Sequence, residues 1–253
     1  MTDKSWQLRT QSFILQKSCS DFAECEDAIG INAALSRFAV VDGATEAFDA
    51  RNWATLLAES WVEDERAIVS IDAFRSCVAE QSLRLHASWH GRALSWYAEE
   101  KARAGSYAAF VGVQFDMNAK LPRWHAIALG DCCLIHLRNR SIKRSFPLAD
   151  DEQFTSSPVL VPSLESMRDA ALSKTLLDSG TIENGDIFLL LSDAVAAWYL
   201  KQAKQRDAVC DEFDAQLAAS QHDELTRLFD RERVALRIKD DDIAVLRIAA
   251  SYS

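Results

Sequence analysis

Acidic residues that flank apolar runs are the residues of this chain best suited to chemistry. An acidic pair at 26–27 precedes one apolar run, and Asp42 and Asp193 each end another. An acidic triplet at 240–242 precedes the last apolar run. Carboxylates held at strand ends can converge, and converging carboxylates repel one another unless a cation neutralises them. Hard oxygen ligands select Mg²⁺ or Mn²⁺, so the set predicts a divalent-cation site.

Each acid taken alone has an ordinary structural role. An Asp at the end of a strand is more often a turn or helix-capping residue than a ligand. Gly43, which follows Asp42, adds one feature, because a residue without Cβ lets its carbonyl approach a cation. The case for a site therefore depends on the whole ordered set.

The elements that would position these acids are strands and helices in alternating blocks. Apolar patterning predicts strands at 7–16, 27–32, 37–42, 107–115, 124–129, 132–138, 187–192 and 243–248. Helical periodicity predicts helices at 46–62, 71–85, 164–177, 209–217 and 225–229. This order predicts an α+β fold, a four-layer α/β/β/α sandwich of two sheets packed face to face with helices outside each.

Composition predicts one globular domain over residues 1–253, since no internal repeat or Pro/Gly linker divides the chain. Acidic residues outnumber basic ones by 38 to 28, and the net charge of −10 disfavours nucleic acid as a partner. No apolar run suits a signal peptide or a membrane span. We therefore expect a cytoplasmic monomer with no membrane partner.

The cysteines and histidines have no metal-binding spacing. No CxxC is present, and we expect reduced thiols at Cys19, Cys25, Cys77, Cys132, Cys133 and Cys210. His86 and His90 would share a helical face but lack a third ligand nearby in the sequence. They are interpreted as structural, as are His125, His136 and His222, and the Trp-rich stretch 53–96 as core packing.

The ordered acids resemble the protein phosphatase 2C family, the metal-dependent Ser/Thr protein phosphatases, over nearly the whole chain. The resemblance is to the bacterial-type, single-domain members. It rests on six segments in the family's order: Glu26-Asp27-Ala28, Phe38-Ala-Val-Val-Asp-Gly-Ala-Thr45, Gly105-Ser106, Ala128-Leu-Gly-Asp131, Leu189-Leu-Leu-Ser-Asp193 and Asp240-Asp241-Asp242-Ile243-Ala244-Val245.

This resemblance implies the same sandwich fold and a pair of Mn²⁺ or Mg²⁺ ions in a cleft at one end of the sheets. Asp42 would bridge both ions and the Gly43 carbonyl would bind one of them. Asp193 and Asp241 would hold the other ion, so these two and Asp42 would be the catalytic acids.

Three further acids have implied roles at the edge of this pair. Glu26 and Asp27 would act largely through bound water, and Asp131 matches the acid that joins Asp193 at a weaker third metal position. The implied reaction is hydrolysis of phosphomonoesters, phosphoserine and phosphothreonine of a phosphoprotein above all, by a hydroxide that bridges the two cations. A protein kinase would be a natural partner.

Two positions depart from the family pattern. Phe22 stands where the family usually has an Arg that grips the substrate phosphate, so Lys17 or Arg37 would have to compensate. Ala194 replaces a common Gly. Two alternatives stay open: a pseudophosphatase that acts as a regulatory or binding module, and a metal-dependent hydrolase of small phosphoesters.

Overall fold

Two antiparallel sheets form the centre of the molecule. The computed structural model describes residues 5–65, 69–89, 91 and 95–253. The first sheet has the order β1 (Trp6–Leu15), β11 (Ile243–Tyr252), β10 (Ile187–Leu191), β6 (Cys133–Arg138), β7 (Ser141–Phe146). The second has the order β2 (Ala28–Asn32), β3 (Arg37–Gly43), β4 (Tyr107–Asp116), β5 (Arg123–Leu129), β9 (Leu176–Thr181), and the short β8 (Val161–Pro162) also pairs with β4.

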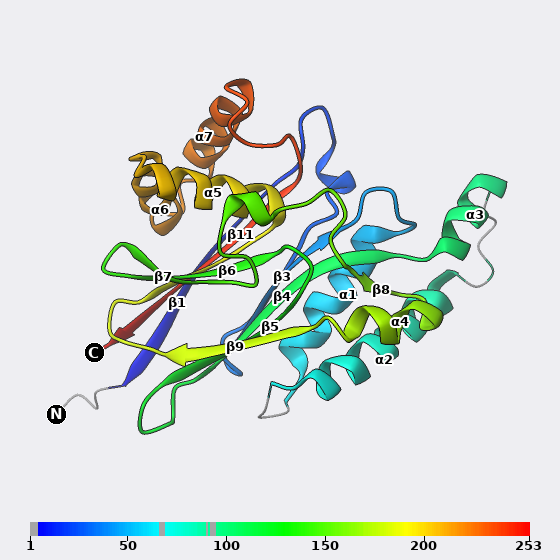
Figure 1. Cartoon of the computed structure of the whole chain (residues 1–253), viewed down its shortest axis with the longest axis horizontal. Helices are drawn as coiled ribbons and strands as arrows, with labels where there is room; N and C mark the ends of the chain where they lie inside the picture. The colour runs from blue at the N-terminus through cyan, green and yellow to red at the C-terminus, as the bar shows by residue number, and fades with distance from the viewer. Residues whose placement is uncertain (1–4, 66–68, 90, 92–94) are drawn as a thin grey trace.

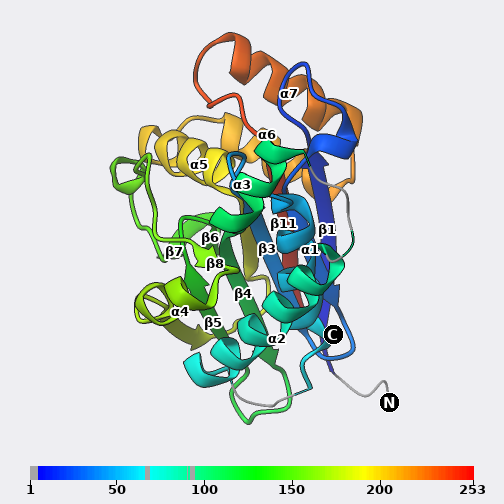
Figure 2. The ribbon, with the colours of Figure 1, turned by 90° about the vertical axis from the view of Figure 1, so that its right-hand side faces the viewer.

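Helices cover the outer face of each sheet (Figures 1 and 2). The first sheet is covered by α5 (Asp193–Gln205), α6 (Val209–Ala218) and α7 (His222–Val234). The second is covered by α1 (Ala50–Glu63), α2 (Ile71–Trp89) and α4 (Glu165–Leu172), while α3 (Trp96–Ala104) lies to the side. Two short 3-10 helices, η1 (Phe22–Glu24) and η2 (Asp151–Gln153), lie in loops.

Three apolar clusters separate these four layers. The middle one fills the space between the sheets and contains Phe38, Trp124 and Phe188. The others pack α5–α7 against the first sheet and α1–α2 against the second. Strands buried on both faces read as continuous apolar runs, which is why the segments that became β3 and β10 were predictable.

The predicted four-layer sandwich is confirmed, although helices α3 and α5 were not predicted and further differences lie at its edges. The predictions contained neither β7 nor β9, because both are edge strands with mostly exposed or half-exposed side chains. The helix predicted at 164–177 is the eight-residue α4, and the chain then enters β9 at Leu176. Helix α1 begins at Ala50 rather than at residue 46, because Asp49 has a left-handed backbone conformation with φ 56°.

Candidate active site

The register of the first sheet brings Asp193 and Asp241 to the same end. Strands β10 and β11 are antiparallel, with Leu191 opposite Val245. Asp193 follows the end of β10, and Asp241 precedes the start of β11, so both lie at one edge. The chain termini lie at the opposite end, where Trp6 pairs with Tyr252 (Figure 1).

The second sheet brings Asp27 and Asp42 together in the same way. Strands β2 and β3 are antiparallel, with Ala28 opposite Val41. Asp27 precedes β2, and Asp42 is the penultimate residue of β3. The remaining acid, Asp131, lies in the turn where the chain leaves β5 in the second sheet and enters β6 in the first.

Electrostatics shows that the acids of the two sheets form one cluster. Burial raises the pKa of Asp27 and of Asp42 well above the usual range, and both are raised further by the charges of Asp193 and Asp241. Burial, with the charge of Asp193, raises the pKa of Asp131 to about 6. Burial also raises the pKa of Glu26. All the acids predicted as ligands therefore meet at one end of the sandwich.

Asp27 gives the clearest indication that this cluster binds a cation. Its side chain is only 7 % exposed, and neither of its carboxylate oxygens accepts a hydrogen bond of good geometry. The nearby Ser192 hydroxyl only partly opposes the rise in pKa. A buried carboxyl group with so little hydrogen bonding is costly to ionise unless a cation neutralises it. The donor set, carboxylate and carbonyl oxygens alone, fits Mg²⁺ or Mn²⁺.

A lysine of the protein itself contacts two acids of this cluster. The Lys239 ammonium lies 2.5 Å from Asp241 Oδ2 and 3.5 Å from Asp193 Oδ2. Although burial opposes it, contact with these two carboxylates raises the pKa of Lys239. Within the described ranges, no group of three or more His, Cys, Asp or Glu side chains is arranged to hold a metal ion as it stands.

Asp242 is a positioning residue that the sequence analysis did not identify. Its carboxylate is buried and accepts backbone N–H bonds from Lys17 at 2.9 Å and from Glu26 at 2.8 Å. It therefore ties the segment that carries Glu26 and Asp27 to the start of β11. The acidic triplet was the available signal, but the sequence did not show which of its members bonds to this distant segment.

Gly43 is required by close packing as well as by its position after Asp42. A Cβ at Gly43 would lie 2.8 Å from the Glu26 carbonyl oxygen and 2.9 Å from that of Ala50. The Gly43 N–H donates to the Glu26 carbonyl at 3.3 Å. The glycine thus lets the end of β3 approach the acidic pair at 26–27.

Lys17 and Arg37 were expected to replace the phosphate-binding Arg that is Phe22 here, and they differ in their location. Arg37 is wrong for this role, because it begins β3, at the end away from Asp42, where it is buried over the Trp61 ring and paired with Asp64. Lys17 lies 3.8 Å from Glu26 Oε2, at the site.

Arg51, which the sequence analysis missed, lies beside Phe22. Its guanidinium is 5.7 Å from the Phe22 ring centre and donates to the carbonyls of Phe22 and Ala23. Phe22, Arg51 and Asp27 together line a hollow of about 180 Å³. No sequence pattern indicated that the start of α1 would meet the 22–24 turn.

The described histidines lie outside the cluster, whereas two buried thiols adjoin it, Cys25 beside Asp27 and Cys132 beside Asp131. His136 is buried, stacks on Phe188 with ring centres 4.4 Å apart, and lies 2.9 Å from Asp186. His86 contacts the ring of Trp89, and His90 falls outside the described residues. None of the six cysteines, all within the described residues, forms a disulfide, and Cys19 is the exposed one among them.

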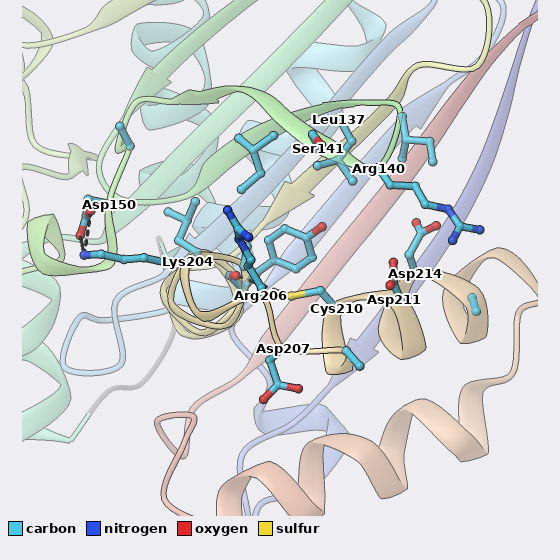
Figure 3. Close-up of a pocket in the computed structure, with 18 residues that line it drawn as sticks. Leu137, Arg140, Ser141, Asp150, Lys204, Arg206, Asp207, Cys210, Asp211 and Asp214 are labelled. Atoms are coloured by element: carbon cyan, nitrogen blue, oxygen red, sulfur yellow. Dashed lines mark hydrogen bonds and ion pairs between the residues drawn. The ribbon is translucent and has the colours of Figure 1, made fainter.

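A larger hollow lies elsewhere, between the β6–β7 turn and helices α5 and α6. It has a volume of about 880 Å³ and is lined by mixed charges and apolar side chains. Figure 3 shows Lys204, Arg206 and Cys210 on the helical side and Leu137, Arg140 and Ser141 on the other. None of the predicted metal-binding acids lines it. Asp131 instead lines a smaller hollow of about 210 Å³, together with Lys174.

Comparisons with solved structures identify the fold. The Pseudomonas aeruginosa protein PppA, described as a key regulatory component of T6SS, matches at 18 % identity and TM-score 0.59, over 98 % of this chain and all of that one. The catalytic domain of the serine threonine protein phosphatase PstP in complex with two manganese ions matches at 14 % identity and TM-score 0.64. The match covers 98 % of this chain and all of that one. Staphylococcus aureus serine/threonine phosphatase Stp1 matches at 17 % identity and TM-score 0.63, over 96 % of this chain and 95 % of that one.

The chain therefore has the fold of the protein phosphatase 2C-type serine/threonine phosphatases, as its motifs predicted. No protein-family model matches the chain, and no curated protein matches it in sequence. None of the helices in the part of the chain that the structure describes has the length and apolarity needed to cross a membrane.

Proposed function

We propose that this protein is a metal-dependent phosphatase of the protein phosphatase 2C type that hydrolyses phosphomonoesters, chiefly phosphoserine and phosphothreonine in proteins. The observation that carries the proposal is the buried carboxylate of Asp27, whose one hydroxyl neighbour, Ser192, offsets little of the cost of burial, inside a cluster of acids contributed by both sheets. Such a cluster is stable at neutral pH when cations neutralise it. The fold shared with PstP, whose structure contains two manganese ions, supports the same conclusion.

The chain's own residues would hold the ions and the substrate. Asp42 with the Gly43 carbonyl would bind on one side, and Asp193 with Asp241 on the other. Glu26 and Asp27 would position water, while Asp131 would serve a third ion. Bound Mn²⁺ or Mg²⁺ would supply an activated water for in-line attack and would screen the phosphoryl oxygens.

The test is hydrolysis of p-nitrophenyl phosphate and of a phosphoserine peptide by the purified, metal-stripped chain with and without Mn²⁺. We expect turnover only with the ion, and a chelator should abolish it, because the nucleophile depends on the metal. Asp42→Asn should lower kcat by at least about a hundredfold, on the scale of losing one principal transition-state contact.

The matched control is Asp211→Asn, since Asp211 is an exposed acid on α6 outside the cluster. Its turnover should equal that of the unmodified chain. Hydrolysis that survives metal removal, or an Asp42→Asn protein with near-normal turnover, would refute the proposal.

A second candidate function is a pseudophosphatase that serves as a regulatory module. Phe22 in place of the usual phosphate-binding Arg favours it. The similarity to PppA, a regulatory component, points the same way. The experiment above separates the two, because a pseudophosphatase would bind Mn²⁺ without turning over either substrate.

A further inference from the structure

The Lys239 ammonium contacts one oxygen of each carboxylate of the Asp193–Asp241 pair. The other oxygen of each already accepts a backbone bond: Asp193 Oδ1 from the N–H of Ala194 at 2.5 Å, and Asp241 Oδ1 from that of Asp242 at 3.0 Å. The remaining oxygen of each is the one that contacts Lys239. A divalent ion that binds both acids through these oxygens therefore meets the ammonium first.

The backbone on either side of Lys239 is firmly held. Ile238 is buried in the cluster beneath α5–α7. Arg233 donates to the carbonyls of Asp241 at 2.7 Å and Gln16 at 3.1 Å, and pairs with Asp240 at 3.3 Å. The Lys239 side chain itself is 64 % exposed. The contact is thus set by the fold, while the ammonium is free to swing into solvent.

In the other half of the cluster, the basic side chain that the structure describes is Lys17, which lies 3.8 Å from Glu26 Oε2. Within the described part of the chain, no basic side chain forms an ion pair with Asp27 or Asp42. An incoming ion would meet two carboxyl groups there that contact no ammonium. The two halves of the site therefore differ in what metal binding has to overcome.

We infer that Lys239 is a tethered counter-cation that neutralises the Asp193–Asp241 pair until a divalent ion displaces it. The inference rests on the proposed function. The Asp42 half then fills first, and the Asp193–Asp241 half fills at higher metal concentration. Lys239 thereby sets the metal concentration at which the two-ion site is complete.

The test is calorimetric titration of the metal-stripped full chain with Mn²⁺. The unmodified chain should show two classes of Mn²⁺ site that differ in dissociation constant. Lys239→Gln should lower the Kd of the weaker class by about tenfold, because one competing charge-assisted contact is lost. Lys239→Arg keeps the tethered charge, so the Kd of the weaker class should stay within about threefold of that of the unmodified chain.

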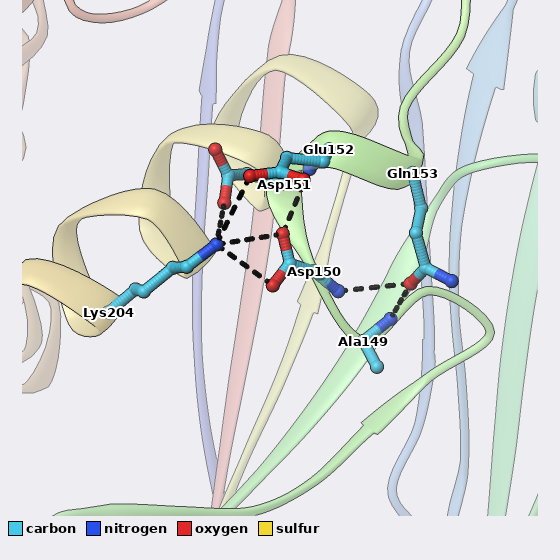
Figure 4. A network of polar contacts seen from close by, with 6 residues as sticks. All are labelled: Ala149, Asp150, Asp151, Glu152, Gln153 and Lys204. Carbon is cyan, nitrogen blue, oxygen red and sulfur yellow. Dashed lines mark hydrogen bonds and ion pairs between the residues drawn. The ribbon is translucent and has the colours of Figure 1, made fainter.

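Two control variants lose the same charge elsewhere. Lys204 pairs with Asp150 at 3.1 Å and with Glu152 at 3.5 Å, a comparable cluster outside the site (Figure 4). Lys17 lies near the site but contacts Glu26. Lys204→Gln and Lys17→Gln should each leave the weaker class nearly unchanged.

The outcomes separate the two proposals. If both Mn²⁺ dissociation constants were the same in Lys239→Gln as in the unmodified chain, the role of Lys239 would be overturned and the proposed function would stand. An equal gain in Mn²⁺ affinity in Lys17→Gln would also overturn the role of Lys239, because the loss of any nearby positive charge would then explain the effect. Absence of Mn²⁺ binding in every variant would overturn both.

Discussion

At the scale of single residues, Arg51 is the cation best placed to take the role that an Arg at position 22 would have. It reaches the 22–24 turn from the start of α1, with its guanidinium 5.7 Å from the Phe22 ring centre. Asp27 lines the same hollow. A guanidinium there can meet a phosphoryl oxygen from a different part of the chain than in the usual pattern.

We expect Arg51→Gln to lower kcat/KM for a phosphoserine peptide by about tenfold, mainly through a higher KM. The reason is the loss of a charge-assisted hydrogen bond worth roughly 1.5–3 kcal/mol. Arg51→Lys should recover only part of the loss, because an ammonium lacks the planar fork. Steady-state kinetics with Mn²⁺ measures both values.

Arg84→Gln is the control for this prediction, since Arg84 is exposed on α2 and pairs with Glu80 in the same helix. Its kinetics should be unchanged. If Arg51→Gln behaved like this control, Lys17 would be the remaining candidate for the phosphate grip.

At the scale of elements, the site depends on how β11 holds the segment before β2. Asp242, just before β11, bonds to two backbone N–H groups of residues more than two hundred positions away in sequence. We expect Asp242→Ala to lower the free energy of unfolding by about 2 kcal/mol, because two partly buried backbone donors lose a charged acceptor. Urea denaturation of the metal-stripped protein measures this.

Asp240→Ala is the matched comparison. Asp240 accepts one backbone bond, from Ser18 at 2.9 Å, and its side chain is 51 % exposed. Its loss should therefore cost less than the loss of Asp242. Equal losses in the two variants would contradict the positioning role of Asp242.

At the scale of the whole molecule, the fold concentrates negative charge at one end of the sandwich, and this makes the stability of the metal-stripped protein depend on pH. Burial and the charge of Asp193 raise the pKa of Asp131 to about 6, from about 3.9 in an unfolded chain. Between these values the folded state holds more protons, so the free energy of unfolding falls as pH rises from about 4 to about 6.

Asp131→Asn should remove this contribution. Relative to the unmodified chain, the variant should gain about 1–3 kcal/mol of stability between pH 4 and pH 7, the equivalent of up to about two pKa units. Urea denaturation across this range measures the difference, and other titrating groups cancel in it. Asp169→Asn, at a side chain that is 97 % exposed, should show no such gain. A pH-independent difference for Asp131→Asn would contradict the prediction.

The sequence by itself determined the layers and the candidate ligands. Continuous apolar runs predicted β3 and β10, and the alternation of strand and helix blocks predicted the sandwich. The acids at the ends of those runs were identifiable because an Asp that interrupts a buried strand pattern is conspicuous. These signals are local, and local periodicity is what a single sequence records.

Only the tertiary structure decided which of these ends meet. Arg37 and Asp42 lie on the same strand, five residues or roughly 16 Å apart, so one reaches the site and the other cannot. Lys239 and Arg51 contact the site through loop geometry and helix placement, for which no spacing rule exists. Strand pairing across more than two hundred residues brought Asp242 to Lys17 and Glu26, and pairing is a property of the folded sheets rather than of any segment.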